Sequence, residues 1–154
     1  MTVRIFPLVL CLLVALVAPP AAAQSDTPAP TPGSTTIDQT VAAAFQSVIG
    51  AQLDAFQRDD WVSAFSYAAP SIQEVFGDPP GFRSMVLNGY RAVAQPMVFD
   101  FQDATVLNGR PAQVVYVVGP DGKAYRAVYF MQQQPDGSWK ISGVTLFLLE
   151  GTTT

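Results

Sequence analysis

Residues 97–119 read MVFDFQDATVLNGRPAQVVYVVG, and the fold class depends on this stretch. Its first half alternates apolar and polar residues, with Phe99 and Phe101 on one face. Side chains two positions apart lie on the same side of a strand, so this period predicts a β-strand. The Asn-Gly pair at 108–109 is typical of a two-residue hairpin turn, and 112–119 is predicted as the second strand.

Two further strands follow along the chain, each after a Pro-Asp-Gly turn. The turns lie at 120–122 and 135–137, and the strands are expected within 123–134 and 138–149. On the third strand, one face is expected to carry Tyr125, Ala127, Tyr129 and Met131, and the other Arg126, Val128 and Phe130. The pattern therefore predicts a four-stranded antiparallel meander.

The residues before this sheet follow a helical period instead. Apolar side chains three or four positions apart predict a first helix over 37–57, begun by a capping box of Thr36 and Gln39. Asp59 or Asp60 is predicted as the N-cap of a short second helix. A carboxylate at that position accepts the free amide hydrogens of the first turn.

A second capping box is expected at 71–74, and Gly77 is expected to end the turn that it begins. A third helix is predicted over 81–93, before Pro96 closes the helical half. Three helices followed by a four-stranded meander give an α+β domain. The helices are expected to pack on one face of the sheet.

The N-terminus resembles a secretory signal peptide over residues 1–23. A short apolar run follows Arg4, and small residues precede a predicted cleavage site after Ala23. A retained anchor is one alternative. A lipoprotein cysteine at Cys11 is another, although Leu10 stands where such a site prefers a small residue.

The remaining chain divides into three parts. Residues 24–36 are rich in Pro, Ser and Thr and are predicted to be a disordered linker. Residues 37–150 form the folded domain, and 151–154 are a short tail. We expect a periplasmic or secreted protein with no stable membrane insertion after the signal is cleaved.

The composition excludes several kinds of chemistry. The chain has no histidine, and its single cysteine, Cys11, leaves with the signal. Ser-His-Asp and Cys-His nucleophile systems are therefore excluded, as is an ordinary zinc site. Loss of Arg4 leaves seven basic against 12 acidic residues, a net charge of −5. We expect no metal, no cofactor and no nucleic-acid partner.

The order of helices before a curved antiparallel sheet resembles the NTF2-like (cystatin-like) cone. The sequence itself, over about residues 45–148, resembles a bacterial family of uncharacterised secreted proteins, domain of unknown function 4864. The matching positions are Gln52, Ala55, Phe56, Asp60, Ala64, Phe65, Pro70, Ile72, Phe76, Phe82, Met85, Val86, Tyr90, Asp136, Gly137 and Trp139. The family often has a cysteine where this chain has Val144, which argues against a functional thiol here. The resemblance implies a fold and a compartment, and no established activity.

The side-chain groups that remain for catalysis are the carboxylates of Asp and Glu and the phenols of Tyr. Some enzymes with this fold, ketosteroid isomerase among them, use an Asp base and a Tyr donor in an apolar cone. Asp54, Asp60 and Asp100 are candidates for the base. Each also has a structural interpretation that we prefer. Asp60 would cap a helix, Asp100 would be solvated on its strand, and Asp54 would pair with Arg58 four residues on.

The tyrosines suggest a binding site. Tyrosine has an apolar ring and a polar tip, so several together can line a ligand pocket. The candidate ligand-binding residues are Tyr67, Tyr90, Tyr116, Tyr129 and Arg91. No residue is predicted to be catalytic. The alternative for each tyrosine is a core position whose hydroxyl reaches water.

A second apolar set is expected on the sheet face opposite the tyrosines. It consists of Val115, Val117, Val128, Phe130, Val144 and Leu146. Because the helices cover only one face, a second subunit would cover this one, which favours a homodimer through the sheet.

We therefore expect a non-enzymatic module that binds a small ligand or a protein partner. The alternative is an isomerase- or dehydratase-like enzyme that uses a buried Asp and a Tyr in the cone.

Overall fold

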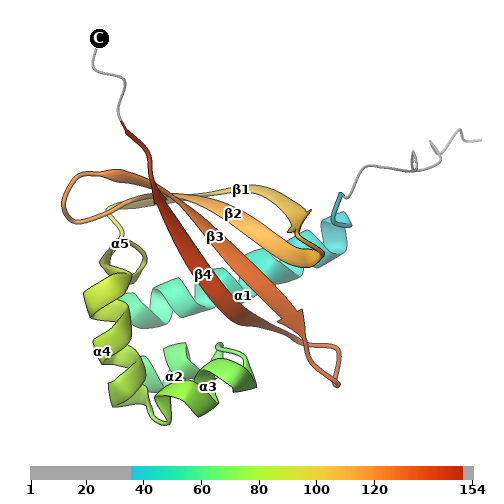
Figure 1. Ribbon diagram of the computed structural model, residues 1–154, viewed down its shortest axis with the longest axis horizontal. Coiled ribbons are helices and arrows are strands. Elements are labelled where there is room, and N and C mark those ends of the chain that lie inside the picture. The colour runs from blue at the N-terminus through green and yellow to red at the C-terminus, as the bar shows by residue number, and fades with distance from the viewer. Residues whose placement is uncertain (1–35, 151–154) are drawn as a thin grey trace, which may run out of the picture. The chain divides into compact units, whose positions relative to one another are not determined.

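The computed structural model describes residues 36–150, which form helices packed against one β-sheet (Figure 1). Three predicted parts lie outside the described residues: the signal peptide at 1–23, nearly all of the linker at 24–36, and the tail at 151–154. The helices are α1 Gln39–Gln57, α2 Trp61–Ser66, α3 Pro70–Phe76, α4 Pro79–Gly89 and α5 Arg91–Ala94. The strands are β1 Val98–Leu107, β2 Arg110–Val118, β3 Ala124–Gln133 and β4 Trp139–Leu148.

The α+β class and the four-stranded antiparallel sheet are confirmed, but the described residues form five helices rather than three. The segment after Ala69 is a helix, α3, where only a capped turn was expected. The predicted helix over 81–93 divides at Tyr90, whose φ of −133° lies outside the helical range. Gly89, a weak helix former, precedes this break.

Two predicted helix starts are wrong. Thr36 does not cap α1, because Asp38 is the N-cap and its carboxylate accepts the Thr40 amide hydrogen at 2.8 Å. Thr36 instead pairs with Thr105 in an isolated β-bridge. The capping box at 71–74 is also wrong, because the N-cap of α3 is Ala69, two residues before Ser71, and the helix begins at Pro70. Proline suits the first helical position, where its missing amide hydrogen has no partner to lose.

The capping role of Asp60 is confirmed. Its carboxylate accepts the Ser63 amide hydrogen at 3.0 Å, at the start of α2. Hydrogen bonds from Ser63 lower the pKa of Asp60, which is the direction expected for a cap and opposite to that of a buried catalytic acid. The neighbouring Asp59 accepts a hydrogen bond from the indole nitrogen of Trp61 at 2.5 Å.

The sheet has the strand order β1-β2-β3-β4, and each neighbouring pair is antiparallel. Asn108 and Gly109 both have positive φ, of 51° and 75°, as the predicted Asn-Gly hairpin turn requires. Gly122 and Gly137, in the two Pro-Asp-Gly turns, also have positive φ. The meander and its turns are therefore confirmed.

The helices cover one face of the sheet, with α1 lying across it (Figure 1). The core between them contains, from the helices, Phe45, Ile49, Leu53, Phe56, Phe82 and Val86, and from the strands Val115, Val117, Ala127, Tyr129, Met131 and Ile141. Within residues 36–150, no helix has both the length and the apolar character needed to cross a membrane.

The predicted division of the sheet faces is only partly right. Val128 and Phe130 alternate with Tyr129 on β3 and lie on the opposite face, as predicted. The rest of the predicted outer set pairs with Tyr125, Ala127 or Tyr129 and lies on the core face: Val115, Val117, Val144 and Leu146. Tyr116 pairs with Arg126 and lies on the opposite, outer face. A shift of one residue in register exchanges the two faces of a strand, and an alternating pattern alone does not fix the register between strands.

Candidate functional site

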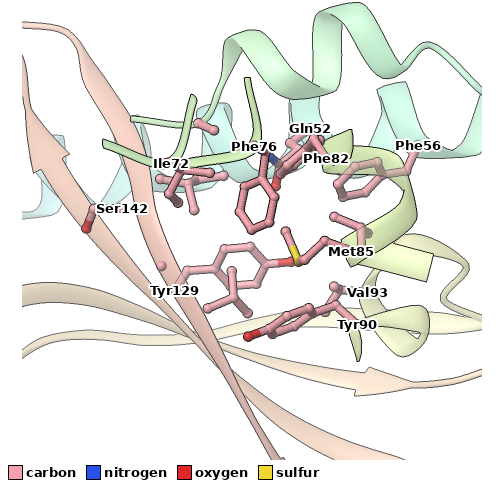
Figure 2. A pocket seen from close by; sticks show the side chains of 15 residues that line it. Gln52, Phe56, Ile72, Phe76, Phe82, Met85, Tyr90, Val93, Tyr129 and Ser142 are labelled. Carbon is pink, nitrogen blue, oxygen red and sulfur yellow. The ribbon is translucent and has the colours of Figure 1, made fainter. Parts of the chain in front are cut away.

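A cavity of about 220 Å³ lies between the helices and the C-terminal half of the sheet. Figure 2 shows the side chains that line it. The lining residues are Gln52, Phe56, Ala68, Ile72, Phe76, Phe82, Met85, Val86, Tyr90, Val93, Tyr129, Ile141, Ser142, Gly143 and Val144. Ile72, Phe76, Met85 and Tyr90 are only half-buried, so the cavity opens to the surface between α3, α4 and the sheet.

The helical wall of the cavity is an aromatic cluster centred on Phe82. Its ring lies 5.3 Å from that of Phe65, 6.2 Å from that of Phe56 and 6.3 Å from that of Phe76. These residues come from α1, α2, α3 and α4, so one side chain joins four helices. Met85 follows Phe82 by three positions on α4, and this spacing places both on one face of the helix.

The sheet wall depends on an irregularity in β4. Met131 pairs with Ile141, whereas the preceding residue, Phe130, pairs with Gly143, so Ser142 has no partner opposite it. Such a bulge changes the alternation of side chains along a strand. Ile141 and Val144 therefore both face the cavity, although their spacing of three would separate them on a regular strand.

Tyr129 is the central polar residue of the cavity. It projects from β3 between Phe76 and Tyr90 (Figure 2), and its side chain is 0% exposed. Its hydroxyl oxygen is buried and has no hydrogen-bond partner. Removal from water raises the pKa of this phenol, so it stays protonated and can donate.

Gln52 is a second buried polar residue of the wall, and the sequence-based prediction of the site did not include it. Its side-chain nitrogen donates to the backbone carbonyl of Ala64 at 3.1 Å, which ties α1 to α2. The sequence does indicate a buried role for Gln52, since this residue lies on the apolar stripe of α1 between Ile49 and Phe56. A polar residue on such a stripe needs a buried partner.

None of the acidic or basic residues described at 36–150 lines this cavity. Asp54 forms the expected ion pair with Arg58 on the surface of α1. Asp100 is exposed and accepts a hydrogen bond from the Gln102 side chain at 2.7 Å. Asp60 caps α2, as described above. The three candidate bases therefore lie away from Tyr129.

The structure brings together two of the five predicted ligand-binding residues, Tyr90 and Tyr129. Tyr67 is half-buried, and its backbone carbonyl accepts the Ile141 amide hydrogen at 2.9 Å. Tyr116 lies on the outer face of the sheet. Arg91 is exposed and lines a separate hollow of about 190 Å³.

Metal-ligating side chains do not gather in the part of the chain that the structure describes. Across residues 36–150, no group of three or more His, Cys, Asp or Glu residues is placed to hold an ion. The chemistry of the cavity consists of an apolar wall, one buried hydroxyl and one buried amide.

The chain was compared with curated proteins, solved structures and family models. No curated protein and no solved structure matches the chain. Residues 38–154 match the family described as Domain of unknown function (DUF4864), and the chain therefore belongs to that family.

Proposed function

We propose that this protein binds a small, mainly apolar molecule in the cavity between its helices and its sheet. The observation that carries this proposal is the cavity itself, lined by apolar and aromatic side chains with few polar groups. Ligand sites are usually preformed hollows of this composition, with a small number of polar groups that fix the orientation of the ligand. Its volume of about 220 Å³ exceeds the ~150 Å³ that holds one benzene molecule.

A binding role fits the residues better than catalysis does. An isomerase- or dehydratase-like mechanism needs a carboxylate beside the bound substrate to move a proton. The described residues place no Asp or Glu in the cavity wall, and Asp60, the candidate nearest a helix end, serves as a cap. We therefore do not propose the enzymatic alternative.

The proposed setting is the periplasm or the medium, and the proposed fold class is the NTF2-like cone. The setting is supported by the resemblance of residues 1–23 to a signal peptide. The fold class is supported by the order of helices before an antiparallel sheet that they cover on one face. The intact mass of the secreted protein should correspond to a chain that begins at Gln24. A mass that retains the first 23 residues would refute cleavage.

We further propose that the outer face of the sheet pairs with a second copy of the chain. Asp100, Tyr116, Arg126 and Phe147 lie in one row across the four strands. A two-fold axis along β2 would place Arg126 opposite the partner's Asp100, and opposite charges in that arrangement attract. Phe147 lies on β4, two strands from this axis, and stays outside the contact.

Light scattering during size-exclusion chromatography tests the dimer. We expect wild-type protein to elute as a dimer and Arg126→Glu to elute as a monomer, because the variant places a negative charge opposite the partner's Asp100 and like charges oppose association. Phe99→Glu is the control and should remain dimeric, because Phe99 is next to Asp100 on β1 but faces the opposite, core side of the sheet. A wild-type monomer would contradict this part of the proposal.

The ligand-binding proposal is tested by filling the cavity. We expect toluene to raise the thermal unfolding midpoint of the wild-type protein, because a ligand that binds only the folded state stabilises it. In Val144→Phe the added ring occupies part of the cavity, and the increase should disappear.

Val114→Phe is the matched control for this experiment. Val114 is also a half-buried valine of the sheet, but it lies on the outer face. Its toluene response should equal that of the wild type, and circular dichroism should show that both variants fold. The absence of a wild-type response, or an equal response in Val144→Phe, would overturn the proposal.

A further inference from the structure

The unpartnered hydroxyl of Tyr129 indicates what kind of ligand the cavity selects. Among the described residues, two buried side-chain atoms lack a hydrogen-bond partner, and only the Tyr129 hydroxyl belongs to the cavity wall. The other, the side-chain oxygen of Gln113, does not line the cavity, and its amide nitrogen donates to the Gln102 and Val114 carbonyls. A buried donor without an acceptor destabilises the folded state, so folded proteins rarely retain one.

A ligand oxygen would supply the missing acceptor. The phenol is fixed in β3 and surrounded by apolar side chains, so water does not compete for it. A hydrocarbon of the same shape would fill the space and leave the hydroxyl unpartnered. A ligand with a correctly placed oxygen would therefore bind more tightly than its hydrocarbon analogue.

Charge sets a second limit on the ligand. A buried ionic group requires an opposite charge or several hydrogen bonds, and the lining residues offer neither a lysine nor an arginine. A carboxylate or an ammonium group would lose its hydration without replacement. Only a neutral molecule enters this cavity without that penalty.

We propose that the cavity selects a neutral, mainly apolar molecule of about the size of one substituted ring, and that this molecule carries an oxygen that accepts a hydrogen bond from the Tyr129 hydroxyl. Tyr129 is then the specificity-determining residue of the site. This inference rests on the proposed function, because it names the class of ligand for the same cavity.

The hydroxyl is covered in the ligand-free protein, so a neighbouring side chain moves when the ligand binds. Met85 is suited to this movement. It is half-buried and lines the same cavity as Tyr129. Methionine is unbranched and has three rotatable bonds, so it changes rotamer more easily than the aromatic residues around it.

Two probes that differ at one position test the selectivity. Acetophenone has a carbonyl oxygen where α-methylstyrene has a CH₂ group, and the two molecules otherwise have the same shape. Titration calorimetry would give the Kd of each probe for wild-type protein and for Tyr129→Phe. We expect the wild type to prefer acetophenone over α-methylstyrene by about tenfold more than the variant does, as one hydrogen bond implies.

The matched control is Tyr125→Phe. Tyr125 lies on the same face of β3, but its hydroxyl donates to Asp121 at 2.8 Å, outside the cavity. This variant should keep the wild-type preference. Benzoate, which has the ring of acetophenone and a negative charge, should not bind.

The outcomes separate the inference from the proposed function. If both probes bind and Tyr129→Phe does not change their ratio, the cavity binds ligands but Tyr129 does not select them, and the inference is wrong. Binding of benzoate as tightly as acetophenone also overturns it. If neither probe binds the wild type, the proposed function fails together with the inference.

Discussion

Replacement of Phe82 by alanine should lower the free energy of unfolding by about 4 kcal/mol, the usual effect of removing a fully packed aromatic side chain. Phe82 is 4% exposed and lies at the centre of the aromatic cluster that joins α1, α2, α3 and α4. The substitution removes its contacts with three other rings. It also enlarges a cavity that already exists, so the surrounding helices have little to collapse onto.

Urea unfolding measures this effect, with the midpoint reporting stability and the slope reporting the surface exposed. Phe147→Ala is the matched control. Phe147 is 52% exposed on the outer face, and its removal should change stability by less than about 1 kcal/mol. A loss below about 1 kcal/mol for Phe82→Ala would show that the aromatic cluster does not hold the helices together.

Replacement of Tyr129 by phenylalanine should have the opposite sign and raise the free energy of unfolding by about 1 kcal/mol. The hydroxyl of Tyr129 is buried without a partner, whereas in the unfolded chain it bonds to water. The phenylalanine ring fills nearly the same volume and carries no such penalty. Under the proposed function, the unpartnered hydroxyl lowers the stability of the folded protein and supplies the selectivity of the site, a relation often found where a protein binds a ligand.

The same variant should also differ from the wild type in how its stability depends on pH above 10. Burial raises the pKa of Tyr129 above the ordinary value of 10.0. The stability that depends on the bound proton is therefore complete below pH 10 and is lost as the pH rises above it, by at most about 1.4 kcal/mol per pH unit. We expect the wild type to lose stability above pH 10 more steeply than Tyr129→Phe. Equal slopes and equal stabilities would show that the hydroxyl reaches water in the folded protein, as it does in the unfolded chain.

The sheet was predictable from the sequence because its signals are local. Alternation along β1 to β3, the Asn-Gly pair at 108–109 and two Pro-Asp-Gly turns specify a meander without information from distant residues. The helix starts were less predictable. The capping-box pattern occurs at 36–39 and at 71–74, but Asp38 and Pro70 offer better starts nearby. Two neighbouring residues can each serve as the helix start, and the one that is used depends on where the helix begins to pack against the core.

The site was only half predictable, because it depends on register. Tyr90 and Tyr129 line the same cavity, whereas Tyr116 lies on the other face of the sheet. The bulge at Ser142, which turns Val144 toward the cavity, has no clear signature in the sequence. Such irregularities arise from the pairing of strands that are distant along the chain.

The proposed function requires that an apolar ligand occupies the space between the helices and the core face of the sheet. Nuclear Overhauser effects between bound toluene and the protein's methyl groups would locate the ligand, since they report contacts of a few ångströms. We expect signals to the methyl groups of Met85, Val86 and Val144, which line the cavity. Signals confined to Val114 and Val128 on the outer face, or none at saturating toluene, would contradict it.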